Sequence, residues 1–133
     1  MPDSVSAQAA RDLLTKAVPS TGVRLPVIGI GTNRFRTGDP AWTARLRDTL
    51  SAFSRLGGKV IDTAPSYGDS EQAIGTLLAD TGLRERVFLA TKLDRGSVVD
   101  GRQRLAASFA ALGTRRLDLV QLHNLRGAES LLP

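Results

Sequence analysis

Four side chains that could take part in acid–base chemistry each stand at the end of an apolar segment. Asp62 follows the run V-I, and Tyr67 lies in the turn P-S-Y-G shortly after it. Lys92 follows F-L-A-T, and His123 follows L-D-L-V-Q-L. The chain contains one Tyr, one His and only three Lys. Because such scarce residue types recur at equivalent places, we interpret them as one set.

This set could donate a proton to a carbonyl oxygen. A lysine beside a carboxylate keeps its charge, and a cation beside a phenol favours the phenolate form. Tyr67 would then be a usable general acid or base, and His123 could hydrogen-bond the same substrate oxygen. Each residue also has a structural explanation when taken alone. Asp62 could bind the backbone amides of a turn, and Tyr67, Lys92 and His123 could be ordinary surface side chains.

The elements that must position this set alternate regularly between strand and helix. Strands are predicted to begin near Val27, Lys59, Val87 and Leu117, with one helix between each pair. Repeated units of this kind predict a parallel sheet with right-handed crossovers, either an open doubly wound sheet or a barrel. Both architectures place their active sites at the carboxyl ends of the strands. Periodicity alone does not choose between them.

The segments before and between these strands carry ordinary start and stop signals. Residues 1–17 are expected to form an N-terminal arm or a short helix, and residues 18–133 the folded domain. A Gly-containing turn between two short extended runs predicts a hairpin before a continuous strand over 27–32. Helices are expected from Pro40, from Asp69 or Ser70 acting as a cap, and from about Gly101. Their apolar faces are expected to comprise Trp42, Leu46, Leu50 and Phe53; Ile74, Leu77 and Leu78; and Leu105, Phe109 and Leu112.

Composition limits the partners that this chain could take. Its 133 residues are 41% apolar and 23% charged, as in one ordinary soluble domain. No apolar run is long enough to span a membrane, no export signal is found, and a cytoplasmic location is expected. With no cysteine and one histidine, no bound metal is expected. The net charge of +5 comes from dispersed arginines, so we expect a solvated surface and no nucleic-acid binding, although an anionic cofactor would suit this charge.

Three segments resemble the aldo/keto reductases, in the order and spacing of that family. They are V-I-D-T-A-P-S-Y-G-D-S-E-Q-A-I-G, F-L-A-T-K and L-D-L-V-Q-L-H-N, and V-R-L-P-V-I-G-I-G-T resembles the family's hairpin and first barrel strand. The resemblance covers about residues 19–124. It implies a TIM-type (β/α)8 barrel that transfers a hydride from NADPH to a small aldehyde or ketone.

The resemblance also implies a role for each matching residue. Tyr67 resembles the proton donor to the carbonyl oxygen, Lys92 and Asp62 the pair that tunes it, and His123 the residue that orients the carbonyl. Gly31, Thr32 and Asp62 resemble positions that line the nicotinamide ribose. The G-I-G around Ile30 is not a dinucleotide fingerprint, because Arg34 replaces the third glycine.

The length predicts a barrel truncated after about four strands. A complete barrel needs about 250 residues, and in the family the later strands supply most of the cofactor site. The outer strands would then expose unpaired edges, so self-association or a complementing half is expected. The alternative function is a non-catalytic half barrel or interaction module.

Overall fold

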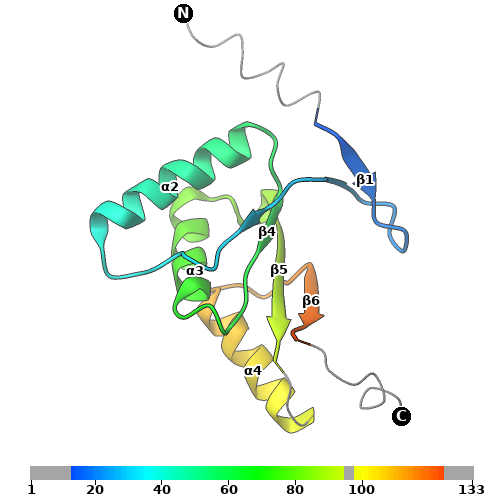
Figure 1. Cartoon of the computed structure of the whole chain (residues 1–133), viewed down its shortest axis with the longest axis vertical. Helices are drawn as coiled ribbons and strands as arrows, with labels where there is room; N and C mark the ends of the chain where they lie inside the picture. Colours follow the sequence, from blue (N-terminus) through cyan, green and yellow to red (C-terminus); the bar gives the residue numbers. More distant parts are fainter. Residues whose placement is uncertain (1–12, 95–97, 125–133) are drawn as a thin grey trace, which may run out of the picture.

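Two separate sheets organise the part of the chain that the structure, a computed structural model, describes: residues 13–94 and 98–124. One is an antiparallel hairpin and the other a four-stranded parallel sheet in the order β3-β4-β5-β6 (Figure 1). The hairpin strands are β1 (Thr15–Ala17) and β2 (Arg24–Pro26), and the parallel strands are β3 (Ile30–Gly31), β4 (Val60–Asp62), β5 (Phe88–Leu93) and β6 (Leu119–Leu122). The predicted α/β fold with an N-terminal hairpin is therefore confirmed.

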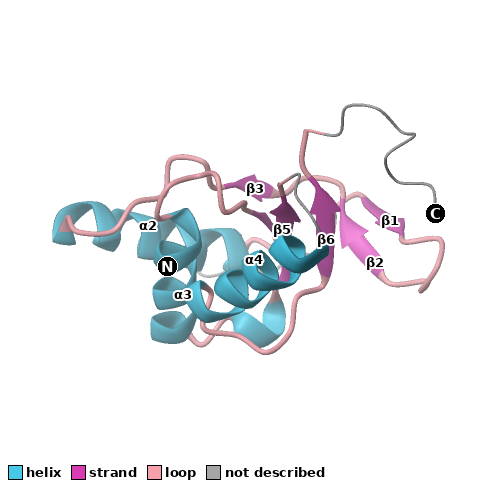
Figure 2. Ribbon diagram, turned by 90° about the horizontal axis from the view of Figure 1, so that it is seen from below, coloured by secondary structure: helices cyan, strands magenta, loops and turns pink. Residues whose placement is uncertain are grey.

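Three helices connect the parallel strands and lie on one face of the sheet. They are α2 (Pro40–Arg55), α3 (Ser70–Thr81) and α4 (Val98–Ala111), and a short 3-10 turn, η1 (Arg84–Arg86), precedes β5. Figure 2 shows the helices as one layer and the strands as another, with no described helix on the opposite face of the sheet. No helix of the described ranges has the length and apolar character needed to cross a bilayer.

Local signals account for helix α2 as predicted. The Asp39 carboxylate accepts hydrogen bonds from the backbone amides of Ala41 and Trp42, at 2.9 and 3.1 Å. These two amides have no partner inside the helix, so the cap stabilises its first turn. Leu46 and Leu50 are buried on the face that packs against the other elements.

Helix α3 begins and ends where expected, but its cap differs from the prediction. The carboxylate of Asp69 makes no capping hydrogen bond; it accepts instead from the backbone amide and the hydroxyl of Thr37. Gly82 ends the helix in the left-handed conformation, with φ 64°. A tertiary contact from a loop thus replaces the local cap that the sequence suggested.

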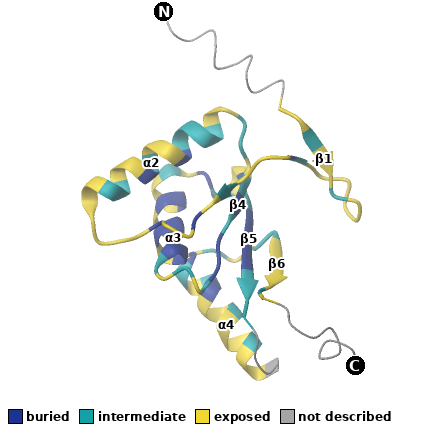
Figure 3. Cartoon of the chain, viewed as in Figure 1, coloured by how far each residue is buried: buried dark blue, intermediate teal, exposed yellow. Residues whose placement is uncertain are grey.

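The hydrophobic core lies between the helices and the sheet. Figure 3 shows the buried positions gathered on α3 and β5, while much of α4 and the whole of β6 is exposed. The core's fully buried side chains include Leu50, Ile61, Ile74, Leu77 and Leu89. The predicted apolar faces of α2 and α3 are confirmed as parts of this core.

Strand β3 is shorter than the predicted strand over 27–32. The Val27 amide donates to the Leu14 carbonyl at 3.0 Å, so this part of the segment extends the hairpin. Val27 and Ile28 are exposed as a result. Strand β1 includes Thr15–Ala17, which the sequence placed in the N-terminal arm, so the hairpin begins earlier than expected. The rest of the predicted arm, residues 1–12, lies outside the described residues.

Candidate active site

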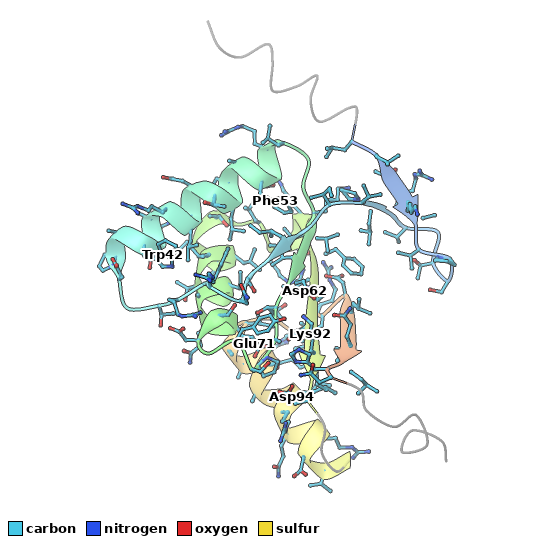
Figure 4. All side chains as sticks on the ribbon, viewed as in Figure 1. Trp42, Phe53, Asp62, Glu71, Lys92 and Asp94 are labelled. Atoms are coloured by element: carbon cyan, nitrogen blue, oxygen red, sulfur yellow. The ribbon has the colours of Figure 1, made fainter. Side chains whose placement is uncertain are left out.

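The register of the central strands brings Asp62 and Lys92 together. Asp62 pairs with Ala90 across the β4–β5 ladder, and Lys92 stands two residues further on, so the three side chains share one face. Lys92 Nζ lies 2.6 Å from Asp62 Oδ2 and donates a second hydrogen bond to the Thr63 carbonyl at 2.9 Å. Figure 4 shows the two labelled side chains beside each other on the sheet. The pair lies on the face that no described helix covers.

Tyr67 reaches the same pair from the turn between β4 and α3. Its amide donates to the Ala64 carbonyl at 3.1 Å, and Gly68 follows with φ 65°, a conformation that suits glycine. Lys92 Nζ lies 5.1 Å from the centroid of the Tyr67 ring, within the range of a cation–π interaction. The ammonium group therefore contacts both a carboxylate and a phenol ring.

Buried hydroxyl groups fix this turn to the sheet. Ser70 donates to the Thr32 carbonyl at 2.8 Å and lies 2.9 Å from the Thr32 hydroxyl and 3.1 Å from that of Thr63. The Thr32 hydroxyl donates in turn to the Asp62 carbonyl at 3.0 Å. All three side chains are fully buried, so these hydrogen bonds do not compete with solvent. The network joins the ends of β3 and β4 to the start of α3.

The loop after β3 is held against the same turn by the contact between Thr37 and Asp69. The hydrogen bonds from the Thr37 hydroxyl and amide lower the pKa of the Asp69 carboxyl below its ordinary value. An open pocket of about 640 Å³ borders this loop and is lined by Asn33, Arg34, Arg36, Asp39 and Trp42. None of the four candidate catalytic side chains lines this pocket.

His123 completes the cluster from the end of β6. Its amide donates to the Leu93 carbonyl at 2.8 Å, which extends the β5–β6 ladder by one bond. The imidazole ring lies edge-on to Tyr67, with the ring centroids 6.0 Å apart and an interplanar angle of 87°. Its Nδ1 lies 3.0 Å from Asp94 Oδ1 and 3.3 Å from the Ser66 hydroxyl. Asp62, Tyr67, Lys92 and His123, all predicted from the sequence, are therefore neighbours.

Sequence reasoning missed three residues that support the cluster. Asp94 and Ser66 contact His123, and Glu71 is buried beneath the site. Glu71 Oε1 accepts from the Thr91 hydroxyl at 2.6 Å, and its Oε2 from the Ser108 hydroxyl at 3.1 Å. The available signal for Asp94 was its position two residues after Lys92, at the same strand end. Glu71 gave no signal, because an acidic residue in the first turn of a helix is ordinary.

The three residues predicted to line the cofactor site differ in which of their atoms are accessible to a ligand. Gly31 is exposed, and a Cβ there would meet no atom within 4 Å, so its backbone borders open space. Thr32 is fully buried, and both its hydroxyl and its carbonyl are committed to internal hydrogen bonds. Asp62 keeps its Oδ1 free of hydrogen bonds to described residues. At this edge, the Gly31 backbone and one carboxylate oxygen of Asp62 are therefore the groups available to a ligand.

Comparison with known proteins gives a consistent result. The model of the aldo/keto reductase family matches residues 27–132. Norsolorinic acid reductase A of Aspergillus parasiticus is 32% identical over 111 residues, which cover 76% of this chain and 28% of that protein. Aldo-keto reductase YhdN of Bacillus subtilis is 29% identical over 126 residues, covering 80% and 37%.

Solved structures share the fold. An aldo/keto reductase of Klebsiella pneumoniae in complex with NADP and acetate superposes with a TM-score of 0.70 at 30% identity, covering 86% of this chain and 41% of that one. An aldo-keto reductase from the same organism, solved in complex with NADPH, superposes with a TM-score of 0.71 at 30% identity. The chain thus spans about a third of the length of the curated relatives and less than half of these structures. It contains part of the TIM barrel of these proteins, and it belongs to the aldo/keto reductase family.

Proposed function

We propose that this chain carries the proton-donating part of an NADPH-dependent carbonyl reductase site. The single observation that carries the proposal is the position of Lys92 Nζ, which is 2.6 Å from the Asp62 carboxylate and 5.1 Å from the Tyr67 ring centroid. A phenol held beside a paired ammonium group is suited to proton transfer. The substrate would be a small aldehyde or ketone.

Tyr67 is the acid in this proposal. Its hydroxyl gives a proton to the carbonyl oxygen as negative charge develops there, and the Lys92 ammonium stabilises the phenolate that remains. Asp62 keeps Lys92 in place by accepting its hydrogen bond at 2.6 Å. His123, edge-on to the Tyr67 ring, donates a second hydrogen bond to the same oxygen and so orients the carbonyl.

NADPH, when bound, supplies the hydride that the carbonyl carbon receives. Gly31 and the free oxygen of Asp62 would hold its nicotinamide ribose, since Gly31 borders open space. Thr32 is fully buried and would support this position through its hydrogen bond to the Asp62 carbonyl. Two solved relatives are described as complexes with NADP or NADPH, which supports this choice of cofactor. The chain's own residues bind the ribose, hold the carbonyl and move the proton.

The site needs further barrel strands to enclose its ligands. The sheet ends at β3 on one side and β6 on the other, and all four residues of β6 are exposed. Since relatives are more than twice as long, the partner that fits these edges is a set of further β/α units of the same family barrel. Open parallel edges of this kind pair readily with strands of matching direction.

The proposal is tested with NADPH oxidation in the presence of a generic aldehyde. The chain is assayed alone and after coexpression with the remaining strands of the Klebsiella pneumoniae relative. We expect turnover by the complemented protein and its loss in Tyr67→Phe. NADPH binding, followed by cofactor fluorescence, should be the same in both, because Tyr67 acts on the substrate oxygen.

Two results would count against it. A complemented, NADPH-binding protein in which Tyr67→Phe retains full turnover would remove Tyr67 as the acid. Stable complexes that bind NADPH and reduce no carbonyl would favour the second candidate, a non-catalytic half barrel. The exposed β6 is the observation that favours this second candidate, because it offers an interaction surface without any chemistry. Light scattering would distinguish a complemented pair from pairing between two copies of the chain.

A further inference from the structure

His123 has an acidic neighbour that the proposed reaction does not use. Asp94 follows the end of β5, and its Oδ1 lies 3.0 Å from His123 Nδ1. The two side chains are largely enclosed, with 18% of His123 and 30% of Asp94 exposed. Figure 4 shows Asp94 next to Lys92, just past the carboxyl end of β5.

The contact determines where the proton of the neutral ring resides. An ionised carboxylate can only accept hydrogen bonds, so the nitrogen that faces it must carry a hydrogen. Ser66 lies 3.3 Å from the same nitrogen, and its oxygen can accept part of that hydrogen bond. This geometry favours a hydrogen on Nδ1. Within the described part of the chain, Nε2 has no hydrogen-bond partner.

The other charged groups near the ring leave this arrangement in place. The Lys92 ammonium on β5 is paired with Asp62 of β4, and it faces the Tyr67 ring in the turn before α3. Arg104 of α4 approaches the second oxygen of Asp94, with 4.0 Å between Nη1 and Oδ2. This contact involves the oxygen of Asp94 that does not face the imidazole.

We propose that Asp94 is a positioning residue that holds His123 in the Nδ1–H tautomer. Nε2 is then the nitrogen that gains and loses a proton. A hydrogen bond from Nε2 to a substrate oxygen consequently requires the doubly protonated ring. In the neutral ring, Nε2 accepts instead of donating.

This has a consequence that rests on the proposed function. If His123 orients a carbonyl by donating from Nε2, the reaction needs an imidazolium paired with Asp94. The carbonyl oxygen then meets two donors, Tyr67 and a charged His123. Reduction should be weaker where the ring is neutral than where it is doubly protonated, because the second donor disappears.

The tautomer can be observed directly because the chain has one histidine. Two-bond proton–nitrogen correlation spectra of the nitrogen-15-labelled chain give a single imidazole pattern, and the two neutral tautomers differ in that pattern. The measurement needs neither cofactor nor substrate. We expect the Nδ1–H pattern when the ring is neutral. An Nε2–H pattern in the wild-type chain would overturn the proposal, whatever the variants do.

Variants separate the role of Asp94 from a general effect on the fold. In Asp94→Ala the Ser66 hydroxyl can donate to Nδ1, so the pattern should change to the Nε2–H form. Asp48→Asn, an exposed acid on α2 without a described partner, should leave the wild-type pattern unchanged. If Asp94→Ala remains folded by its backbone amide spectrum and keeps Nδ1–H, Asp94 does not hold the tautomer.

Activity of the complemented protein provides a second readout. The ratio of kcat/KM at low pH to that at high pH should exceed 10 in the wild type and fall toward 1 in Asp94→Ala, since a neutral Nε2–H ring donates at high pH. A tenfold ratio is a lower bound, because removal of one preorganised donor to a developing oxyanion costs about 10²–10³ in kcat. Absence of any turnover would count against the proposed function alone, because the spectra test the tautomer independently.

Discussion

Lys92 and Asp62 form an ion pair of 2.6 Å across neighbouring strands, and only 13% of the Lys92 side chain is exposed. Asp62→Ala leaves this ammonium with the Thr63 carbonyl and the Tyr67 ring, neither of which carries a counter-charge. We expect the free energy of unfolding to fall by about 1–3 kcal/mol, because a partly buried charge loses its counter-charge. Urea unfolding measures the loss.

A matched control for this pair lies on the surface. Arg47 and Asp80 are 2.7 Å apart, but more than two fifths of each side chain is exposed. Asp80→Ala should change the unfolding free energy by less than about 1 kcal/mol. Equal losses of unfolding free energy in the two variants would show that partial burial does not make the Lys92–Asp62 pair more stabilising than a surface pair.

Glu71 is expected to be the most important polar residue for stability. It is 6% exposed and accepts hydrogen bonds from Thr91 of β5 and Ser108 of α4. Glu71→Ala would leave both hydroxyls unpaired in the core, so unfolding should become easier by about 2–4 kcal/mol. The control is Glu85→Ala, whose side chain is 79% exposed, with an expected loss below about 0.5 kcal/mol. A loss in Glu71→Ala no larger than that of the control contradicts the prediction.

Two helical glycines should respond in opposite directions to alanine. A Cβ at Gly75 of α3 would lie 2.5 Å from the Ala111 carbonyl oxygen, whereas one at Gly101 of α4 would meet nothing within 4 Å. Gly75→Ala should therefore destabilise the fold by about 1–3 kcal/mol through overpacking. Gly101→Ala should stabilise it by about 0.5–1 kcal/mol through helix propensity. Thermal unfolding of both variants checks the signs, and a stabilising Gly75→Ala would refute the close packing of α3 on α4.

The contact between Thr37 and Asp69 predicts a stability that depends on pH. Hydrogen bonds from Thr37 lower the pKa of Asp69 in the folded chain. A carboxyl with a lowered folded pKa adds stability above its unfolded value, near pH 4, and loses it as pH falls through the folded value. Asp69→Asn should thus be less stable than the wild type at pH 7, and the difference should shrink in acid. Urea unfolding at several pH values measures this difference in unfolding free energy. A difference that grows as the pH is lowered would contradict the prediction.

Much of the fold could be predicted because its signals are local. The apolar spacing of Leu46 and Leu50, the turn before Ser70 and the glycine at 82 each depend on a few neighbouring residues. The proximity of the four predicted site residues could also be anticipated, since Asp62, Lys92 and His123 lie at strand ends, Tyr67 lies in the turn after one of them, and parallel strands end at one edge.

The contacts that were missed depend on tertiary structure. The carboxylate of Asp69 bonds Thr37, 32 residues away, although its position suggested a helix cap. The sequence did not predict that Val27 continues the hairpin, because its apolar neighbours suit pairing with the hairpin and pairing with the parallel sheet equally well. Asp94 and Glu71 look like ordinary polar residues until the folded chain places other side chains against them.

Strand β6 joins the sheet through one neighbour, and its residues are exposed along their whole length. Its N-terminal side is fastened by Asp118, which accepts from the Leu89 amide at 2.8 Å and from Arg84 at 3.2 Å. Because β6 is an exposed edge strand with one neighbour, it should open locally before the chain unfolds globally. Amide hydrogen exchange should accordingly be faster in β6 than in β5. Each opening withdraws His123 while Asp62, Tyr67 and Lys92 remain assembled. His123 and the proposed proton donor Tyr67 thus belong to parts of the sheet that should open at different rates, and a strand paired with β6 should hold them together for longer.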